Sequence, residues 1–342
     1  MTGISKLIIF YFSGTGNAKQ IALWVIECAK ERGIDSQLCN ISTVGSLEMF
    51  DSETAIVIIS PIHGFSYPKI IFDFIKKLPK GNNRVILMAT RAGMRIRNFV
   101  TPGLTGIAFF ASNILLKCKG YRIIGQIPFD MPSNWFFFHP ALNKKTVDFI
   151  FEKNHSRVKK HTEKLFATHR NFLSRKNLPE DILVSPVALG YLLAGRYVLA
   201  KSFYASAKCT NCNLCINNCP VKAITTVRGR PFWSFRCQSC MKCMTDCPAK
   251  AIESAHGLIV IISILSSVAL SLLSSFIVAD YFHSTVVKLL IFTFLLILSL
   301  LVFYRIQHAL LQNKYIEKLI VFTSLTHYKF WGKRNPGKYI EK

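Results

Sequence analysis

Two runs of four cysteines have the residue type and spacing most specific for one chemistry. The runs are Cys209-x2-Cys212-x2-Cys215-x3-Cys219-Pro220 and Cys237-x2-Cys240-x2-Cys243-x3-Cys247-Pro248. In such a run the first three thiolates curve around one Fe4S4 cube, and the fourth, followed by proline, reaches the other cube. The spacing therefore predicts two [4Fe–4S] clusters that share their ligands across the two runs.

The crossed ligand sets follow directly from this geometry. The first cluster is assigned Cys209, Cys212, Cys215 and Cys247, and the second is assigned Cys237, Cys240, Cys243 and Cys219. Zinc is the main alternative, but zinc prefers two well-separated pairs of ligands. Both runs are followed by similar short tails, Val221–Ile224 and Ala249–Ile252, which indicates an internal duplication. This stretch of about fifty residues resembles the bacterial two-cluster ferredoxins.

A glycine-rich loop near the N-terminus is a second candidate site. Its residues are Ser13, Gly14, Thr15, Gly16, Asn17 and Ala18, and they lead from an apolar run into a helical pattern. Glycines let backbone amides face a phosphate, and the helix N-terminus favours negative charge. The loop lacks the Lys-Ser/Thr ending of a nucleotide-triphosphate loop and the three-glycine dinucleotide fingerprint.

The loop resembles the FMN-phosphate loop of flavodoxins, and this resemblance implies that two later loops flank the flavin ring. Those loops contribute Pro61, Ile62, His63, Gly64, Phe65 and Tyr67, and Thr90, Arg91, Ala92 and Gly93. Phe65 or Tyr67 would stack on the ring. Arg91, Arg95 and Arg97 stand where flavodoxins usually carry acidic residues. An α/β domain without its flavin is the alternative.

The elements that must position these loops alternate between strand and helix patterns. Continuous apolar runs such as Leu7–Tyr11, Ala55–Ser60 and Arg84–Thr90 are typical of strands buried on both faces of a parallel sheet. Helical spacing follows in Asn17–Glu31 and Pro68–Leu78. The fold class predicted is an α/β flavodoxin-like doubly wound parallel sheet, followed by a small α+β two-cluster ferredoxin domain and a transmembrane helical hairpin.

The domain boundaries follow changes in composition. We expect a flavodoxin-like FMN-binding domain at 1–140, a basic helical connector at 141–204, a ferredoxin domain at 205–255, a transmembrane hairpin at 256–305 and a basic cytoplasmic tail at 306–342. The whole arrangement resembles the flavodoxin–ferredoxin fusion proteins of anaerobic prokaryotes, whose Met-Pro-x-Asn-aromatic segment is similar to Met131–Trp135. The hairpin and tail are additions to that family's pattern.

The hairpin prediction is based on length and missing charge. Leu258–Ala279 has no charged residue and Val286–Tyr304 has only Lys288, so each could cross a bilayer. Ser263, Ser267, Ser271 and Ser274/Ser275 form a row of small residues along the first segment. The tail from Arg305 has eight Lys/Arg against two Asp/Glu, which predicts cytoplasmic termini. A buried helix pair in a soluble domain is the alternative.

The remaining composition limits the partners and the compartment. The formal net charge is +25, which indicates nucleic acid, anionic lipid or acidic proteins as partners, and lipid headgroups explain it adequately beside a hairpin. The N-terminus shows no signal-peptide pattern, so we expect the soluble parts in a reducing cytoplasm. Cys28, Cys39 and Cys118 match no ligand spacing and are interpreted as buried structural thiols.

Together these features predict a membrane-anchored electron-transfer protein that passes electrons between two [4Fe–4S] clusters and bound FMN. Its expected partners are redox proteins and membrane lipid, and not nucleic acid. The alternative is an FMN-dependent oxidoreductase that reduces a small or lipid-soluble acceptor such as a quinone. No residue constellation indicates hydrolysis or group transfer.

Overall fold

The computed structural model describes residues 4–133, 135, 137, 139, 142–167, 169–273 and 285–327. Contacts divide these residues into two compact units. The first unit contains the described residues up to Trp135 and those from 142 to Leu192. The second contains those from Leu193 to 327, together with Phe137 and His139.

The first unit is built on a parallel sheet with strand order β2-β1-β3-β4-β7-β8. Its strands are β1 (Lys6–Tyr11), β2 (Asp35–Asn40), β3 (Thr54–Pro61), β4 (Arg84–Gly93), β7 (Arg122–Pro132) and the short edge strand β8 (Asn171–Phe172). The order of the first five is the flavodoxin-like doubly wound order. The predicted α/β fold class is therefore confirmed.

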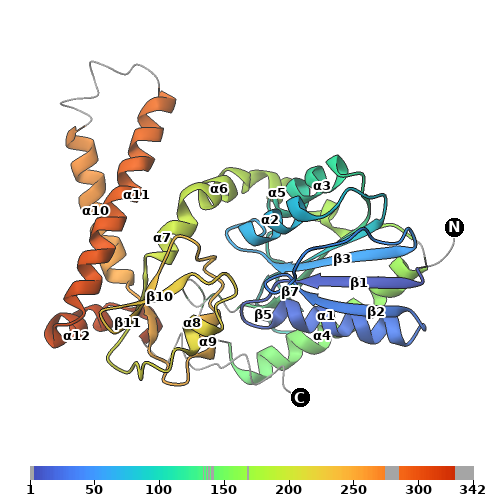
Figure 1. The fold of residues 1–342 in the computed structure, drawn as a ribbon, viewed down its shortest axis with the longest axis horizontal. Coiled ribbons are helices and arrows are strands. Elements are labelled where there is room, and N and C mark those ends of the chain that lie inside the picture. Colours follow the sequence, from blue (N-terminus) through green and yellow to red (C-terminus); the bar gives the residue numbers. More distant parts are fainter. Residues whose placement is uncertain are drawn as a thin grey trace. The chain divides into compact units, whose positions relative to one another are not determined.

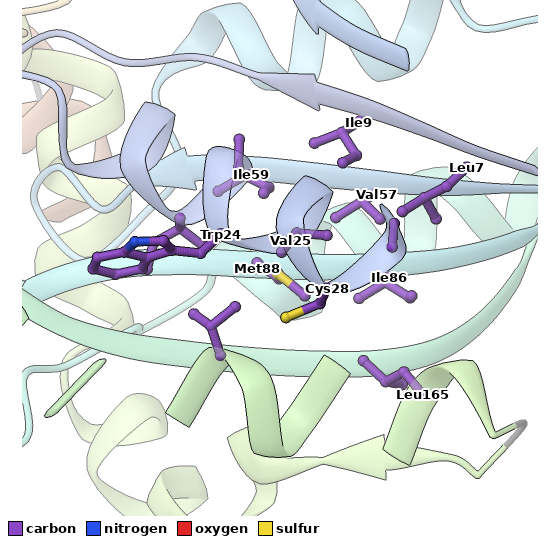
Figure 2. Close-up of a cluster of buried hydrophobic side chains, with 14 of the residues drawn as sticks. Leu7, Ile9, Trp24, Val25, Cys28, Val57, Ile59, Ile86, Met88 and Leu165 are labelled. Carbon is purple, nitrogen blue, oxygen red and sulfur yellow. The ribbon is translucent and has the colours of Figure 1, made fainter. Parts of the chain in front are cut away.

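Helices cover both faces of this sheet (Figure 1). On one face lie α1 (Asn17–Lys30) and α4 (Lys144–Phe166), and on the other lie α2 (Lys69–Lys77) and α3 (Ala108–Cys118). Figure 2 shows Trp24, Val25 and Cys28 of α1 in one apolar cluster with side chains of the sheet and with Leu165 of α4. This core holds the carboxyl ends of the strands, where the two glycine-containing loops begin.

The predicted connector at 141–204 does not form one separate element. Helix α4 packs on the sheet, because Val147, Ile150, Val158 and Leu165 form a fully buried stripe. After it come η1 (Leu173–Asn177), α5 (Leu178–Leu183), α6 (Ser185–Gly190), the π-helical turn η2 (Tyr191–Gly195) and α7 (Arg196–Ala200). Most of the basic residues of α4 are exposed, whereas Arg157 points inward and donates to Asp130 Oδ2 at 3.3 Å. Cys118, interpreted as buried, is exposed, whereas Cys28 is buried as expected.

The second unit contains two short antiparallel strand pairs with a helix after each cysteine turn. The pairs are β9 (Phe203–Ala205) with β12 (Ile252–Ser254) and β10 (Ile224–Val227) with β11 (Arg230–Trp233). The two short helices are α8 (Leu214–Asn217) and α9 (Lys242–Asp246). The pairs are related by the same 28-residue offset as the two cysteine runs, so the duplication extends to the fold.

Two long apolar helices leave this unit, α10 (His256–Leu273) and α11 (Thr285–Leu310). Within the part of the chain that the structure describes, one stretch, Thr293–Leu310, is long and apolar enough to cross a membrane. A second is counted only if the helices Leu173–Leu183 and Ser185–Ala200, bent by 77°, form one span. The two predicted segments were expected to be joined by a six-residue link, Asp280–Thr285, of which Thr285 begins α11. Residues 280–284, the end of the first predicted segment and Ser274/Ser275 lie outside the described residues.

The beginning of the predicted tail is folded rather than free. Helix α11 continues to Leu310, and α12 (Lys314–Phe322) turns back onto the second unit, followed by η4 (Leu325–His327). Leu311 and Ile320 pack with Tyr204 and Ala255 in one apolar cluster. The Tyr204 hydroxyl shares a 2.8 Å hydrogen bond with that of Ser324. Both ends of the helical pair are therefore fastened to the same unit, and residues 328–342 lie outside the described part.

Candidate functional site

The cysteines of the second unit form two groups, and each group takes its fourth member from the other run. Burial, with negative charge at Cys209 and Cys247, raises the pKa of the Cys215 thiol to about 11. Cys209, Cys212, Cys215 and Cys247 also line one open cavity together with Pro231 and Ile252. Cys247, at the end of the second run, therefore lies with the first three cysteines of the first run.

The second group combines three cysteines of the second run with the last cysteine of the first run, and it is more deeply buried. Burial raises the pKa of the Cys237 thiol to about 12, and negative charge at Cys240 and Cys219 acts in the same direction. Burial likewise raises the pKa of Cys243, which also senses charge at Cys237 and Cys219. Cys219, from the first run, therefore lies with Cys237, Cys240 and Cys243.

These groups have the ligand chemistry that an iron–sulfur cluster requires. Across the described residues, no three His, Cys, Asp or Glu side chains converge as ligands of one metal ion. Burial raises the pKa of Cys215 in the first group and of Cys237, Cys240 and Cys243 in the second, and such thiols become thiolates only with a compensating cationic centre. An Fe4S4 cube supplies that charge and spaces its four sulfur ligands apart.

The backbone around the cysteines is shaped to donate to sulfur. Ala223 N–H donates to Cys219 Sγ at 3.2 Å, and Ala251 N–H donates to Cys247 Sγ at 3.3 Å, the equivalent bond 28 residues later. Left-handed backbone conformations recur with the same offset, at Asn211, Asn213 and Lys222 and at Ser239, Met241 and Lys250. Such turns direct successive N–H groups into one concave space, as anion- and cluster-binding loops do.

In the first unit, the Ser13–Ala18 loop links β1 to α1. Gly16 has φ +101° at the helix N-cap, and its N–H donates to Ser13 Oγ at 3.1 Å. Asn17 Nδ2 donates to the carbonyl of Pro132 at 2.7 Å, which ties the loop to the end of β7. The helix has no side-chain cap and no acidic residue in its first turn, so its N-terminus is suited to an anionic ligand.

The second loop begins at Pro61, the last residue of β3, where Ile62 N–H donates to Thr90 O at 2.8 Å. His63 and Ser66 exchange backbone hydrogen bonds, which forces Gly64 and Phe65 into left-handed conformations with φ +52° and +60°. Phe65 is half-buried, and its carbonyl accepts from Ile107 N–H at 3.0 Å. The Gly64 peptide therefore lies at the tip of a tight turn above the sheet.

Tyr67 is a correction to the predicted flavin-stacking pair. Its side chain is fully buried, its hydroxyl donates to Met88 O at 3.0 Å, and its ring meets the edge of Phe109. Burial raises its pKa well above the ordinary value. Tyr67 is thus a core residue, and of the two aromatic candidates only Phe65 remains at the loop.

The predicted loop Thr90–Gly93 is also a correction, because it continues β4. Thr90, Arg91, Ala92 and Gly93 pair in register with Phe129, Asp130, Met131 and Pro132 of β7. The Arg91 side chain is buried, and its Nε donates to Asp130 Oδ1 at 2.6 Å. Arg91 is therefore neutralised inside the unit. Arg95 is exposed, with its guanidinium 4.1 Å from the centre of the Phe149 ring.

An aromatic group at Gly64 includes two residues that the sequence did not single out for the site. The His63 and Trp135 rings are stacked with centroids 6.0 Å apart, and Tyr191 meets Trp135 edge-on at the same distance. A Cβ added at Gly64 would lie 2.1 Å from Tyr191 Cγ, so the tyrosine ring rests directly on the glycine. Trp135 belongs to the segment Met131–Trp135, which the sequence analysis compared with a family motif. Tyr191 lies in the predicted connector, where no sequence pattern indicated a role in the site.

Comparison with known proteins agrees with the second unit's cysteine geometry. Residues 208–252 match the family model of the 4Fe-4S dicluster domain. The chain therefore contains an iron–sulfur domain of this type. No curated protein matches the chain.

Solved structures resemble the first unit only at low identity. A flavodoxin from the domain Archaea is 13% identical, with 46% of this chain and 99% of that chain covered and a TM-score of 0.29. Flavodoxin 1 from Bacillus cereus is 14% identical, with 46% and 99% covered and a TM-score of 0.31. Rubredoxin:oxygen oxidoreductase from Desulfovibrio gigas is 11% identical, with 47% and 37% covered and a TM-score of 0.30.

Proposed function

We propose that this chain is a membrane-anchored electron-transfer protein in which two [4Fe–4S] clusters exchange electrons with bound FMN. The observation that carries the proposal is the crossed grouping of eight cysteines in one unit of a chain whose other unit is an α/β sheet of flavodoxin-like strand order. FMN accepts a pair of electrons or releases them singly, and each cluster handles one. The cofactors supply this chemistry, and the protein supplies position and charge.

The FMN part of the proposal is supported by the loop geometry of the first unit. The Ser13–Ala18 loop would hold the phosphate on the N-terminus of α1. The turn at Gly64, with Phe65, His63, Trp135 and Tyr191 around it, would enclose the flavin ring. Aromatic faces at such a site stack on the ring and exclude water from it.

Valine at position 64 should weaken FMN binding at least about tenfold. A left-handed conformation costs a residue with a Cβ about 1–2 kcal/mol, and 1.4 kcal/mol is a factor of ten in binding. The new side chain would also displace the Tyr191 ring. Gly45→Val is the matched control, because Gly45 is exposed and has no atom within 4 Å of an added Cβ. Fluorescence titration of the deflavinated proteins measures both, and equal affinities would contradict the loop's role.

The membrane part is supported by the exposed surfaces of the two long helices. Large apolar side chains are exposed on both: Val260, Ile261, Ile264, Leu265, Val268 and Leu272 on α10, and Val286, Leu289, Leu290, Phe294, Leu298 and Val302 on α11. An apolar surface of this extent on a soluble protein would be unusual. The predicted segment Val286–Tyr304 is about 28 Å long at 1.5 Å per residue, close to the hydrocarbon thickness of about 30 Å.

The orientation of the helical pair in the membrane is inferred from the ends of α10 and α11 that join the second unit. Helix α10 starts two residues after β12, and α11 ends against β11, where Tyr304 accepts from Trp233 N–H at 3.1 Å. The start of α10 and the end of α11 would therefore lie on the same side of the membrane. This side carries Arg305, Lys314 and Lys318 and would be cytoplasmic.

The full chain should stay with membranes after a high-salt wash, because buried apolar surface and not charge would hold it there. Leu298→Arg, at an exposed position in the middle of α11, should reduce this retention, since arginine at a helix centre costs about 2.5–3.5 kcal/mol on insertion. Tyr315→Arg, at an exposed position of α12, is the matched control and should leave retention unchanged. Sedimentation and immunoblotting give the result, and release of the unaltered chain by salt would contradict the anchor.

Electron exchange between the modules is tested by anaerobic stopped-flow after partial reduction. Because donor and acceptor are on one chain, we expect cluster reoxidation and flavin reduction at a rate independent of protein concentration. A rate proportional to concentration, or no exchange, would contradict an intramolecular route.

A quinone reductase is the second candidate. The observation favouring it is that the Tyr304 hydroxyl of α11 accepts from the N–H of Trp233 at 3.1 Å, and Trp233 lies four residues before Cys237 of the more buried cysteine group. A lipid-soluble acceptor would therefore come close to that cluster. Steady turnover of a quinone in proteoliposomes would favour the enzyme over the carrier.

A further inference from the structure

Lys201 is a buried cation in the second unit that the cluster motifs do not account for. The residue is 6% exposed, and its ammonium donates to the carbonyl of Trp233 at 2.5 Å. Three aromatic rings surround the ammonium, with ring centres 5.0 Å away for Phe232 and 4.6 Å away for Phe235 and Tyr304. One carbonyl and three rings thus replace the water that this charge has lost.

The Lys201 ammonium, with the carbonyl and the three rings around it, lies beside the more buried cysteine group. Burial lowers the pKa of Lys201 to about 8, while negative charge at Cys237 acts in the opposite direction. At neutral pH most of the lysine is therefore charged. The strand that it contacts leads on to the same group, since Cys237 N–H donates to the carbonyl of Ser234, the residue after Trp233, at 3.2 Å.

The internal duplication supplies a comparison within the same chain. Residues 28 positions apart are equivalent in the two cysteine runs, in their left-handed turns and in their strand pairs. This offset carries Lys201 to Gly229, which has no side chain. The carbonyl equivalent to Trp233 O is that of Ala205, and it accepts from Arg230 at 2.7 Å, but Arg230 is paired with Glu317 at 3.2 Å. The cation at the second site is thus held by a carbonyl and aromatic rings, whereas the cation at the equivalent carbonyl is compensated by a carboxylate.

We propose that the Lys201 ammonium raises the reduction potential of the cluster held by Cys219, Cys237, Cys240 and Cys243. The inference rests on the proposed function, since it requires two clusters. Reduction adds one electron from the donor, and this makes the cluster more negative. A cation held in a poorly polarisable site stabilises that reduced form far more than a hydrated charge would. Lys201 acts on the cluster through its electric field and does not touch the reacting atoms.

Neutral replacement of Lys201 tests this in the full chain. Redox titration followed by EPR should show that Lys201→Met lowers the midpoint potential of one of the two clusters and leaves the other unchanged. Lys201→Arg keeps the charge and should retain the original midpoint. Lys208→Met is the matched control, because Lys208 adjoins Cys209 but is exposed, and water and salt screen its charge.

Iron content separates this proposal from the proposed function. Fewer than about eight irons in the unaltered chain would remove the second cluster and sink the proposed function itself. If the unaltered chain and Lys201→Met both hold about eight irons with identical midpoints, the role of Lys201 is overturned. If Lys201→Met loses iron, Lys201→Gln decides in its place, since its amide still donates to Trp233 O: a lowered midpoint supports the proposal, and an unchanged one overturns it.

Discussion

Replacing Cys247 with alanine should remove the same cluster as replacing Cys209, although the two cysteines lie in different runs. The structure groups Cys247 with Cys209, Cys212 and Cys215, and Cys219 with the other run. Loss of one ligand disrupts one cube and leaves the other with four intact ligands. We expect the same reduced-cluster EPR signal to disappear in both single variants.

Double variants make this expectation sharper. Cys209→Ala with Cys247→Ala should keep the second cluster and about four irons, whereas Cys209→Ala with Cys219→Ala should lose both clusters and nearly all iron. Cys118→Ala, at an exposed position outside both groups, is the control and should keep about eight irons. If Cys247→Ala instead removes the signal that Cys237→Ala removes, each run binds its own cluster and the crossed arrangement is wrong.

Alanine at Asp130 should destabilise the α/β unit by about 3–5 kcal/mol, the cost of leaving a buried charge without its partner. Asp130 is 5% exposed, and its carboxylate accepts from Arg91 at 2.6 Å, from Arg157 at 3.3 Å and from Gly103 N–H at 2.9 Å. Its removal leaves Arg91 buried and charged at the end of β4. The ends of β4 and β7, which position the candidate flavin loops, would lose the ion pair that joins them.

The loss should appear as a lower melting temperature of the first unit, followed by the release of bound flavin. At about 2–4 °C per kcal/mol, the expected decrease is roughly 6–20 °C. Asp73→Ala is the control, because its ion pair with Lys69 on α2 is exposed and such pairs contribute about 0.3–0.5 kcal/mol. Similar shifts in the two variants would show that the Asp130 network contributes no more than a surface pair.

Local patterns were sufficient to predict the sheet and the cysteine runs. Strands buried on both faces appear as continuous apolar runs, and β1, β3 and β4 lie where those runs indicated. The cysteine spacing is equally local, since each turn is closed by backbone within a few residues. These features depend on residues close together in the sequence, and the sequence pattern is therefore enough to predict them.

The errors concern side chains whose partners are distant in the sequence. Tyr67 was a candidate for the flavin face, but Met88, 21 residues away, accepts its hydroxyl and buries it. Arg91 was read as a charge beside the flavin, but Asp130 neutralises it from 39 residues away. Tyr191 comes to the Gly64 turn from a stretch that composition marked only as basic and helical. Tertiary contacts decide each of these positions.

The most direct test of the central claim is the iron and flavin content of the chain purified in detergent without oxygen. We expect about eight irons and one FMN per chain. Eight irons without flavin would contradict the flavin half and leave a membrane-bound iron–sulfur protein on an α/β scaffold. Four irons or fewer would contradict the pairing of two clusters on which the electron-transfer proposal depends.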